Sequence, residues 1–282
     1  MSNDERMNEI ARLRETILKE YPRLSENSHF KFKCHPGVSC FNDCCGDVNI
    51  FLTPYDIIRL KNSLGISSAE FLEKYTLSPF DKNLKYPVVL LKMNDDEKKS
   101  CPFVSAEGCR VYNDRPWSCR MYPLGLAAPG ETSQELDNEF YFLLKESVCR
   151  GFDEDHEQTV SEWLADQGIQ DYNRMGEYFK DLTLHEYFRG EHILPPEKIE
   201  MFFTACYNID TFRDKIFNSS FFEKFEIDDE TKKKIKEDDV ELMIFAFQWL
   251  RFALFNEPTM KIKSDILSAR QEELKAKGKL EK

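Results

Sequence analysis

Glycine is scarce in this chain, and it never occurs in the Gly-x-Gly spacing that cradles a nucleotide phosphate. The sequence holds 11 glycines among 282 residues. Closely spaced glycines let a backbone turn approach a phosphate, so their absence leaves no ordinary dinucleotide or S-adenosylmethionine site visible. The sequence also contains no recognisable grouping of Ser, His and Asp and no isolated carboxylate pair, so it identifies no catalytic residue.

Positive charge is also in deficit. The chain has 39 Lys and Arg residues against 51 Asp and Glu residues, which gives a formal net charge of -12. A surface this acidic repels both phosphate backbones and anionic lipid headgroups. We therefore expect neither nucleic acid nor a membrane surface as a partner.

A hydrophobic run long enough to span a bilayer is missing as well. In the most apolar segment the longest charge-free run is 242–250, far short of the roughly 18 to 20 residues that a spanning helix needs. Residues 1–24 carry charges throughout and have no apolar central segment, so we expect no secretory signal or membrane anchor. We therefore expect a cytoplasmic protein, where clustered cysteines more often bind metal than form structural disulfides.

Cysteine, in contrast, is abundant and clustered. Eight of the nine cysteines lie between residues 34 and 149, and none of them forms the Cys-x2-Cys pair of a zinc knuckle. The adjacent residues Cys44 and Cys45 direct their side chains differently, which suits two neighbouring sites or a cluster of several metal atoms. We predict that eight thiolates together hold two zinc ions or one iron–sulfur cluster. The predicted ligands are Cys34, Cys40, Cys44, Cys45, Cys101, Cys109, Cys119 and Cys149.

Other residues near these cysteines are weaker candidates for metal binding. His35 is a candidate ligand, but a single histidine beside a cysteine more often lies next to a metal site than in it. Cys206 lies on the apolar face of a predicted helix and is expected in the core. Three arginines bracket Cys119, where a guanidinium would offset the negative charge of thiolates, although each could instead pair with a surface acid. They are Arg110, Arg115 and Arg120.

Helical patterns dominate the first part of the chain, with one β element among them. Apolar spacing predicts a helix over residues 4–20, and capping patterns at Thr53 and Ser67 predict two more, the first of which ends at Gly65. A strand is predicted over 86–93, with a polar turn and a returning strand through 101–104. This hairpin would deliver the second group of cysteines.

The second half is predicted to be helical throughout. Helical spacing recurs near 160–164, 172–182, 195–206 and 238–255, and the last segment is apolar on nearly every face, which indicates a buried helix. The tail from residue 264 is expected to be a solvated helix or a frayed end.

We predict a mainly α fold with a small β-hairpin (α+β), in which an irregular cysteine-rich metal-binding region packs on a helical bundle. Two domains are expected. Residues 1–155 would form an N-terminal helix plus a cysteine-cluster metal-binding domain, and residues 156–282 a helical region with a charged tail.

One motif connects this chain with a known family. The stretch Cys109-Arg-Val-Tyr-Asn-Asp-Arg-Pro-Trp-Ser-Cys119-Arg-Met-Tyr-Pro123 follows Cys101-Pro-Phe and a cluster ending in Cys-Cys. Over about residues 30–155 the chain resembles the YkgJ-type cysteine-cluster family, and this resemblance implies a zinc- or iron-chelating domain. The gap from Cys34 to Cys40 is longer than the two or three residues usual in the family, which sets Cys34 apart. The positions that fall on the family pattern are Cys34, Cys40, Cys44, Cys45, Cys101, Cys109, Cys119, Arg115, Pro116, Arg120, Tyr122 and Pro123.

Three functions remain open from the sequence. The leading one is a cytoplasmic metal-binding protein with an iron–sulfur cluster or zinc, whose helical second half serves as a scaffold or as a surface for another protein. The flagellin lysine N-methylases are similar over the same motif, which implies an iron–sulfur-dependent enzyme acting on protein lysines as an alternative. A third is a thiol redox or metal-handling protein with Cys44 and Cys45 as a reactive pair.

Overall fold

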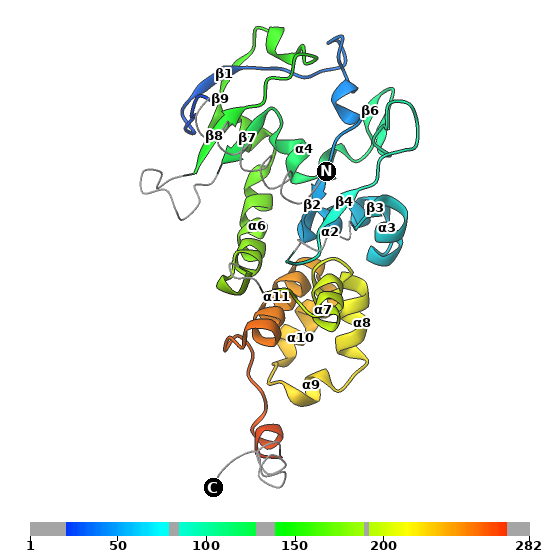
Figure 1. Cartoon of the computed structure of the whole chain (residues 1–282), viewed down its shortest axis with the longest axis vertical. Coiled ribbons are helices and arrows are strands. Elements are labelled where there is room, and N and C mark those ends of the chain that lie inside the picture. Colours follow the sequence, from blue (N-terminus) through cyan, green and yellow to red (C-terminus); the bar gives the residue numbers. More distant parts are fainter. Residues whose placement is uncertain (1–20, 79–84, 128–138, 189–191, 270–282) are drawn as a thin grey trace. The chain divides into compact units, whose positions relative to one another are not determined.

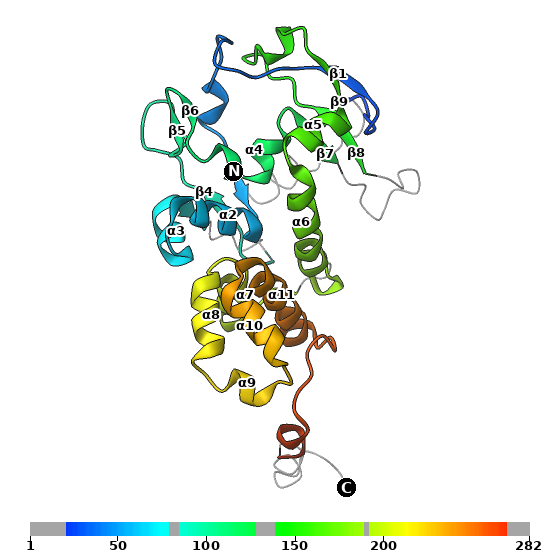
Figure 2. The ribbon, with the colours of Figure 1, turned by 180° about the vertical axis from the view of Figure 1, so that it is seen from behind.

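The computed structural model describes residues 21–78, 85–127, 139–188 and 192–269 (Figures 1 and 2). Helices dominate these ranges, and the strands are short and antiparallel, which confirms the predicted mainly α fold with a small β content. The helix predicted over residues 4–20 lies outside the described residues. Residues 264–269 are helical, and the rest of the predicted tail also lies outside the described ranges. None of the helices in these ranges has the length and apolar character needed to cross a bilayer.

The chain divides into two compact units that alternate along the sequence. The first unit comprises residues 1–48, 93–112 and 117–171, and the second comprises residues 49–92, 113–116 and 172–282. The boundary predicted near residue 155 is a single cut, whereas the units exchange chain segments several times. Whether residues 1–155 and 156–282 fold independently of each other stays a prediction.

The first unit holds all eight of the predicted ligands and is mostly loops and short strands. Its elements are β1 (His29–Lys31), η1 (Asp43–Cys45), β5 (Val104–Ser105), β6 (Gly108–Cys109), α4 (Trp117–Met121), β7 (Leu124–Ala127), β8 (Phe140–Leu143), η3 (Gly151–Asp153), β9 (Glu157–Thr159) and α5 (Val160–Asp166). The helix α6 (Ile169–Thr183) and the short turn η2 (Tyr112–Asp114) carry the chain between the two units.

A small apolar core holds the first unit together. It combines Phe30 and Phe32 from the β1 region with Met121 from α4 and Trp163 from α5. The Trp163 indole N–H donates to the backbone oxygen of Met121 at 3.3 Å, so the buried ring has a polar partner as well as apolar contacts. The strand β1 pairs with β9 and β7 pairs with β8 (Figure 1), and β1 and β7 contribute Phe30 and Leu124 to this core.

The second unit is a group of helices with one small sheet. Its elements are β2 (Phe51–Leu52), α2 (Pro54–Leu64), α3 (Ser68–Tyr75), β3 (Thr76–Leu77), β4 (Val89–Leu91), η4 (Glu186–Phe188), α7 (Pro196–Cys206), α8 (Ile209–Phe217), α9 (Phe221–Lys224), α10 (Asp229–Glu237) and α11 (Asp239–Phe255). Helix α11 packs on α7, α8, α10 and α2 (Figure 2). Its buried residues lie on several faces, as expected for a central helix.

The predicted helix starts reflect real caps. The Thr53 hydroxyl accepts the Asp56 backbone N–H, and the Asp56 carboxylate accepts the Thr53 backbone N–H, which together form a capping box. Gly65 adopts the left-handed conformation that ends α2, with φ of 65°. These local signals explain why α2 begins and ends where the sequence predicts.

The predicted hairpin of residues 86–104 is wrong in its strand partners. The turn does close, since the Asn94 N–H donates to the Ser100 carbonyl at 2.8 Å. However, β4 pairs with β2 on one edge and β3 on the other. A strand has only two edges, so none is left for residues 101–104. The returning segment pairs locally instead, as the two-residue strands β5 and β6.

Candidate metal centre

Two cysteine groups that are distant in sequence are joined by backbone hydrogen bonds. The Cys101 N–H donates to the Cys45 carbonyl at 2.7 Å, and the Asp47 N–H donates to the Lys99 carbonyl at 3.0 Å. Gly46 pairs with Ser100 between them. The turn that precedes Cys101 is thereby fixed beside the loop that carries Cys44 and Cys45.

Gly46 is required for this close approach. A Cβ atom at this position would lie 2.7 Å from the backbone oxygen of Lys98, a separation that real Cβ atoms essentially never show. The Gly46 backbone is extended, with φ of -134°, so the requirement comes from contact and not from conformation. Any side chain here would push the two cysteine segments apart.

Cys101 and Cys109 lie in one short hairpin. The strands β5 and β6 pair Val104 with Cys109, and the Arg110 N–H donates to the Phe103 carbonyl at 2.9 Å. The Phe103 N–H in turn lies 3.5 Å from the Cys101 sulfur, to which it donates. Backbone donors aimed at sulfur favour the thiolate form, which is the form that binds metal.

Cys119 and Cys149 are positioned by the apolar core of the same unit. Cys119 lies in α4, and Cys149 packs against the core cluster. The backbone N–H of Arg150 donates to the Cys40 sulfur at 3.0 Å. The segment after Cys149 therefore contacts the first cysteine group directly.

All eight predicted ligands are reduced cysteines outside any disulfide, and each influences or is influenced by another titratable group. Cys44, Cys40 and Cys149 affect the ionisation of Cys34, while Cys101 and Cys119 affect that of Cys45. Cys109 in turn affects Cys101. These relations connect four separate chain segments into one neighbourhood of thiols.

Crowding makes three of these thiols, Cys34, Cys45 and Cys101, harder to ionise. Enclosure by protein atoms, followed by repulsion from neighbouring thiols, raises the pKa of Cys34 to about 11. The pKa of Cys101 is also raised, mainly by burial. Cys44 is the exception, because the Cys45 thiol donates a hydrogen bond to its sulfur and lowers the pKa of Cys44 to about 7. Cys45 correspondingly retains its proton, and its pKa is raised.

The thiols do not close into a coordination sphere. Within the described parts of the chain, no three His, Cys, Asp or Glu side chains lie close enough to hold one ion. The thiols share a neighbourhood, and the assignment of individual ligands stays a prediction.

Two buried hydroxyls beside the cysteines, at Ser118 and Tyr122, have no oxygen or nitrogen partner among the described residues. The Tyr122 hydroxyl faces Cys149, and burial together with that thiol raises the pKa of Tyr122. An unpaired buried hydroxyl costs about 1–3 kcal/mol. A negatively charged thiolate would satisfy such a donor, so the hydroxyls fit a site built for ionised sulfur.

Residues 33–158 match one protein-family model, called CxxCxxCC and described as "Putative zinc- or iron-chelating domain". No curated protein and no solved structure matches the chain significantly. The match covers all eight clustered cysteines and leaves Cys206 outside.

Cys206 has the core position predicted for it. Its side chain in α7 is 1% exposed, and burial raises the pKa of this thiol well above its ordinary value. It belongs to the second unit and lies outside the chelating domain.

His35 in the chelating domain is already engaged at both ring nitrogens. The Gly37 N–H donates to His35 Nδ1 at 3.1 Å, and an N–H can only donate, so Nδ1 is the acceptor. The proton is therefore on Nε2, which donates to Glu154 at 3.2 Å. This arrangement holds His35 beside the thiols and leaves no ring nitrogen free for a metal.

The arginines differ from one another. Arg110 is the one whose charge favours ionisation of Cys101, and its guanidinium also donates to the Pro102 carbonyl. Arg120 is buried and donates to the Gln167 carbonyl at 2.6 Å. Arg115 is also buried, within a segment of the second unit. The three arginines therefore lie in different surroundings, and Arg110 is close enough to Cys101 for its charge to favour that thiolate.

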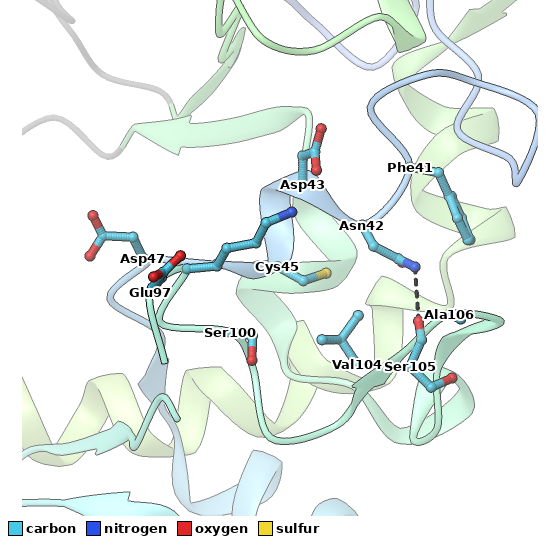
Figure 3. Close-up of a pocket in the computed structure, with 12 residues that line it drawn as sticks. Phe41, Asn42, Asp43, Cys45, Asp47, Glu97, Ser100, Val104, Ser105 and Ala106 are labelled. Atoms are coloured by element: carbon cyan, nitrogen blue, oxygen red, sulfur yellow. Dashed lines mark hydrogen bonds between the residues drawn. The ribbon is translucent and has the colours of Figure 1, made fainter. Parts of the chain in front are cut away.

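Sequence reasoning missed the role of the Tyr122 hydroxyl and a pocket at Cys45. Tyr122 was visible only as part of the motif Cys119-Arg-Met-Tyr122-Pro. The pocket has a volume of about 660 Å³ and is formed by the first cysteine loop and the turn before Cys101 (Figure 3). No spacing in the sequence indicates it, because its walls come from segments about fifty residues apart.

Proposed function

We propose that the chelating domain is a cytoplasmic thiolate metal centre in which the eight clustered cysteines hold either an iron–sulfur cluster or zinc. The observation that carries this proposal is the gathering of eight reduced cysteines from four chain segments into one neighbourhood. The family match supports metal binding in general. The helical second unit would act as a scaffold or as a surface for a partner protein.

The electrostatics of the thiols favour a bound cation. Ionising several adjacent thiols is unfavourable because each negative charge raises the pKa of the next. A metal ion removes this repulsion and displaces the protons, so its binding energy becomes local folding energy. The bound metal would supply Lewis acidity as zinc or electron transfer as an iron–sulfur cluster. The Tyr122 hydroxyl and the N–H groups of Phe103 and Arg150 would donate to the sulfur atoms.

Purification without oxygen, followed by elemental analysis, distinguishes the two metals. Stoichiometric iron and acid-labile sulfide in a brown protein would identify a cluster, while a colourless protein with about two zinc ions would match eight thiolates as two four-cysteine sites. Negligible amounts of every metal, in a protein that folds normally, would overturn the proposal.

Single Cys→Ser substitutions test the ligand set. Changes at Cys44, Cys45, Cys101, Cys109 or Cys119 should lower the metal content. Cys206→Ala is the matched control, because Cys206 is remote from the cluster in sequence and buried in the other unit; its metal content should equal that of the wild type. Cys34→Ser resolves whether the cysteine that departs from the family spacing is a ligand.

A thiol redox function is the second candidate. The observation that favours it is the Cys44–Cys45 hydrogen bond, which lowers the pKa of Cys44 to about 7 and so provides a thiolate at neutral pH. The metal-free protein would then undergo reversible two-electron oxidation of these thiols by a disulfide oxidant such as oxidised glutathione. Stable binding of metal to both sulfurs after aerobic purification would contradict this function.

Enzymatic modification of protein lysines stays a prediction from the sequence resemblance. Equilibrium dialysis of the metal-loaded protein with S-adenosylmethionine tests its first requirement. No binding at millimolar cofactor would contradict it.

A further inference from the structure

The small sheet of the second unit carries apolar side chains on its exposed face. Its strands run in the order β2, β4, β3 (Figure 1), and Leu90 of β4 lies opposite Phe51 on one side and Leu77 on the other. Phe51 is 58% exposed and Leu77 is 53% exposed, whereas the residues that alternate with them along the strands are buried. We call these three residues the apolar row. An antiparallel sheet normally presents polar side chains to solvent, so the apolar row marks a surface that another molecule could cover.

Two lysines without an ion pair lie at one end of the apolar row. The Lys92 N–H donates to the Tyr75 carbonyl at 2.8 Å, which continues the pairing of β4 with β3 by one residue. Alternation along this extended backbone puts Lys92 on the same face as Leu90. The Lys74 ammonium lies 5.1 Å from the centroid of the Tyr75 ring. Neither lysine pairs with a carboxylate of the described chain, although the sequence has 51 acidic residues against 39 basic ones.

The size and charge of this surface favour a short segment of another protein over a second copy of the chain. A stable dimer buries roughly 800 Å² on each partner, which is far more than a row of three side chains supplies. Two copies of a chain with a net charge of -12 also repel each other. A short segment with apolar side chains would cover the row, and carboxylates in that segment would complement the unpaired lysines.

We propose that the apolar row binds a short protein segment in which Asp or Glu residues flank apolar side chains. This inference rests on the proposed role of the second unit as a surface for a partner protein, and it names the face and the chemistry of the partner. The association is non-covalent. Apolar side chains cover Phe51 and Leu77, and carboxylates contact Lys74 and Lys92.

Selection from a phage-displayed library of short random peptides tests this surface on the full-length protein. Library members that bind the variant Phe51→Ser/Leu77→Ser are removed first, so the peptides then recovered on the wild type require the apolar row. The recovered peptides should combine Leu, Ile, Phe or Trp with Asp or Glu. Recovery of basic peptides, or of none above background, would overturn the proposal.

Fluorescence anisotropy with the most enriched peptide, made synthetically, measures the two parts of the surface. The variant Phe51→Ser/Leu77→Ser should weaken binding by about tenfold or more. Lys74→Gln/Lys92→Gln should weaken it about three- to tenfold, and added salt should weaken binding to the wild type because it screens the same charges. Unchanged affinity in the lysine variant would overturn the choice of an acidic partner.

Leu184→Ser is the matched control, because Leu184 is 63% exposed in the same unit and lies outside the sheet. Its affinity for the peptide should equal that of the wild type, and an equal loss in the control would overturn the assignment to the apolar row. Circular dichroism should show an unchanged fold in every variant, since all the replaced side chains are exposed.

Two further measurements on the wild type separate this proposal from other occupants. Dimerisation that Phe51→Ser/Leu77→Ser abolishes would assign the apolar row to a second copy, and binding to phosphatidylserine vesicles that the same variant abolishes would assign it to a lipid surface. Either result would overturn the proposal. Metal analysis of the same preparations tests the metal centre separately, since a metal-free wild type that still selects acidic, apolar peptides would overturn the metal centre and support the apolar row.

Discussion

At the scale of single residues, the chelating domain depends on hydrogen bonds to sulfur as much as on the cysteines. The donors come from backbone N–H groups at Phe103 and Arg150 and from the thiol of Cys45. Each favours negative charge on one particular sulfur. The cluster is therefore a set of unequal thiols, whose order of ionisation is set by their neighbours.

Tyr122→Phe should affect the metal-bound protein much more than the metal-free protein. In the metal-free protein the Tyr122 hydroxyl donates to the Cys149 thiol, which is a weak acceptor, so its removal should leave the free energy of unfolding nearly unchanged. With metal bound, loss of a donor to the Cys149 thiolate should weaken metal affinity by about tenfold, equivalent to the roughly 1.5–3 kcal/mol of a hydrogen bond to a charged group. Cobalt titration and urea unfolding measure the two quantities.

The control for this substitution is Tyr178→Phe, because Tyr178 is 41% exposed and lies in the second unit. Equal metal affinity in Tyr122→Phe and Tyr178→Phe would show that the Tyr122 hydroxyl makes no contact with a metal-bound thiolate.

The thiols should alkylate in an order set by their pKa values. In metal-free reduced protein, the rate of iodoacetamide labelling at Cys44 should reach half its maximum near pH 7, while Cys34 should need a pH near 11. The sign follows because only the thiolate reacts, and the pKa of Cys44 is lowered while that of Cys34 is raised. Peptide mass spectrometry with fragmentation distinguishes Cys44 from Cys45.

Cys45→Ala should move the Cys44 midpoint upward, because the donor that stabilises its thiolate is lost. A Cys44 midpoint that did not move, or one equal to that of Cys34, would contradict the hydrogen bond between these two thiols.

At the scale of elements, the close contact of the first cysteine loop with the turn 94–100 is the feature on which the site depends. Gly46→Ala should force this contact open, at a cost of about 1–3 kcal/mol in the free energy of unfolding, and should reduce metal affinity because the Cys101 N–H would separate from the Cys45 carbonyl. Calorimetry and cobalt titration would measure both effects.

Gly176→Ala is the matched control within α6. Apart from the nearby backbone of α6 itself, no atom lies within 4 Å of the added Cβ, so alanine should stabilise the helix by about 0.5–1 kcal/mol and leave metal affinity unchanged. Parallel losses of metal affinity in both variants would show that the loop contact has no special part in the site.

The elements show what the sequence could and could not predict. The starts of α2, α7 and α11 were predictable because local caps and prolines decide them. The partners of β4 were not, because a strand that is short and apolar accepts any neighbour that reaches its edges, and long-range packing decides which one does. The clustering of cysteines was visible from spacing, whereas the surroundings of the Tyr122 hydroxyl and the pocket at Cys45 depend on contacts between distant segments.

At the scale of the whole molecule, bound metal should stabilise the first unit and leave the stability of the second unit unchanged. Removing the metal with a chelator should lower hydrogen-exchange protection around residues 45–47, 99–103 and 149–153. If the free metal concentration before removal was about 100 times the dissociation constant, the loss of protection should be about 100-fold. Protection in α7 and α11, which carry no predicted ligand, should be unchanged. Exchange followed by mass spectrometry on loaded and stripped protein measures both, and a uniform loss would show that the two units unfold together.

In the second unit, an ion pair joins two of the helices. Lys61 in α2 is 5% exposed and lies 2.8 Å from Asp239 of α11. Burial opposes ionisation of Asp239, but hydrogen bonds from Lys61 and Arg213 outweigh it and hold the pKa of this carboxylate below its ordinary value. The stability it contributes is therefore present above the unfolded pKa, near 3.9, and is lost as the pH falls through the lower folded value.

The alternation of the two units constrains how evolution or an engineer could reuse the chelating domain. The segment 33–158 contains α2 and α3, which pack on α11 and α8. A gene fragment cut at those limits would encode Ile57, Leu60 and Phe71, each 0% exposed in the whole chain, without the helices that cover them. Transplanting the cysteine motif to another protein therefore requires moving its helical companion too, or redesigning the surfaces of α2 and α3 for water.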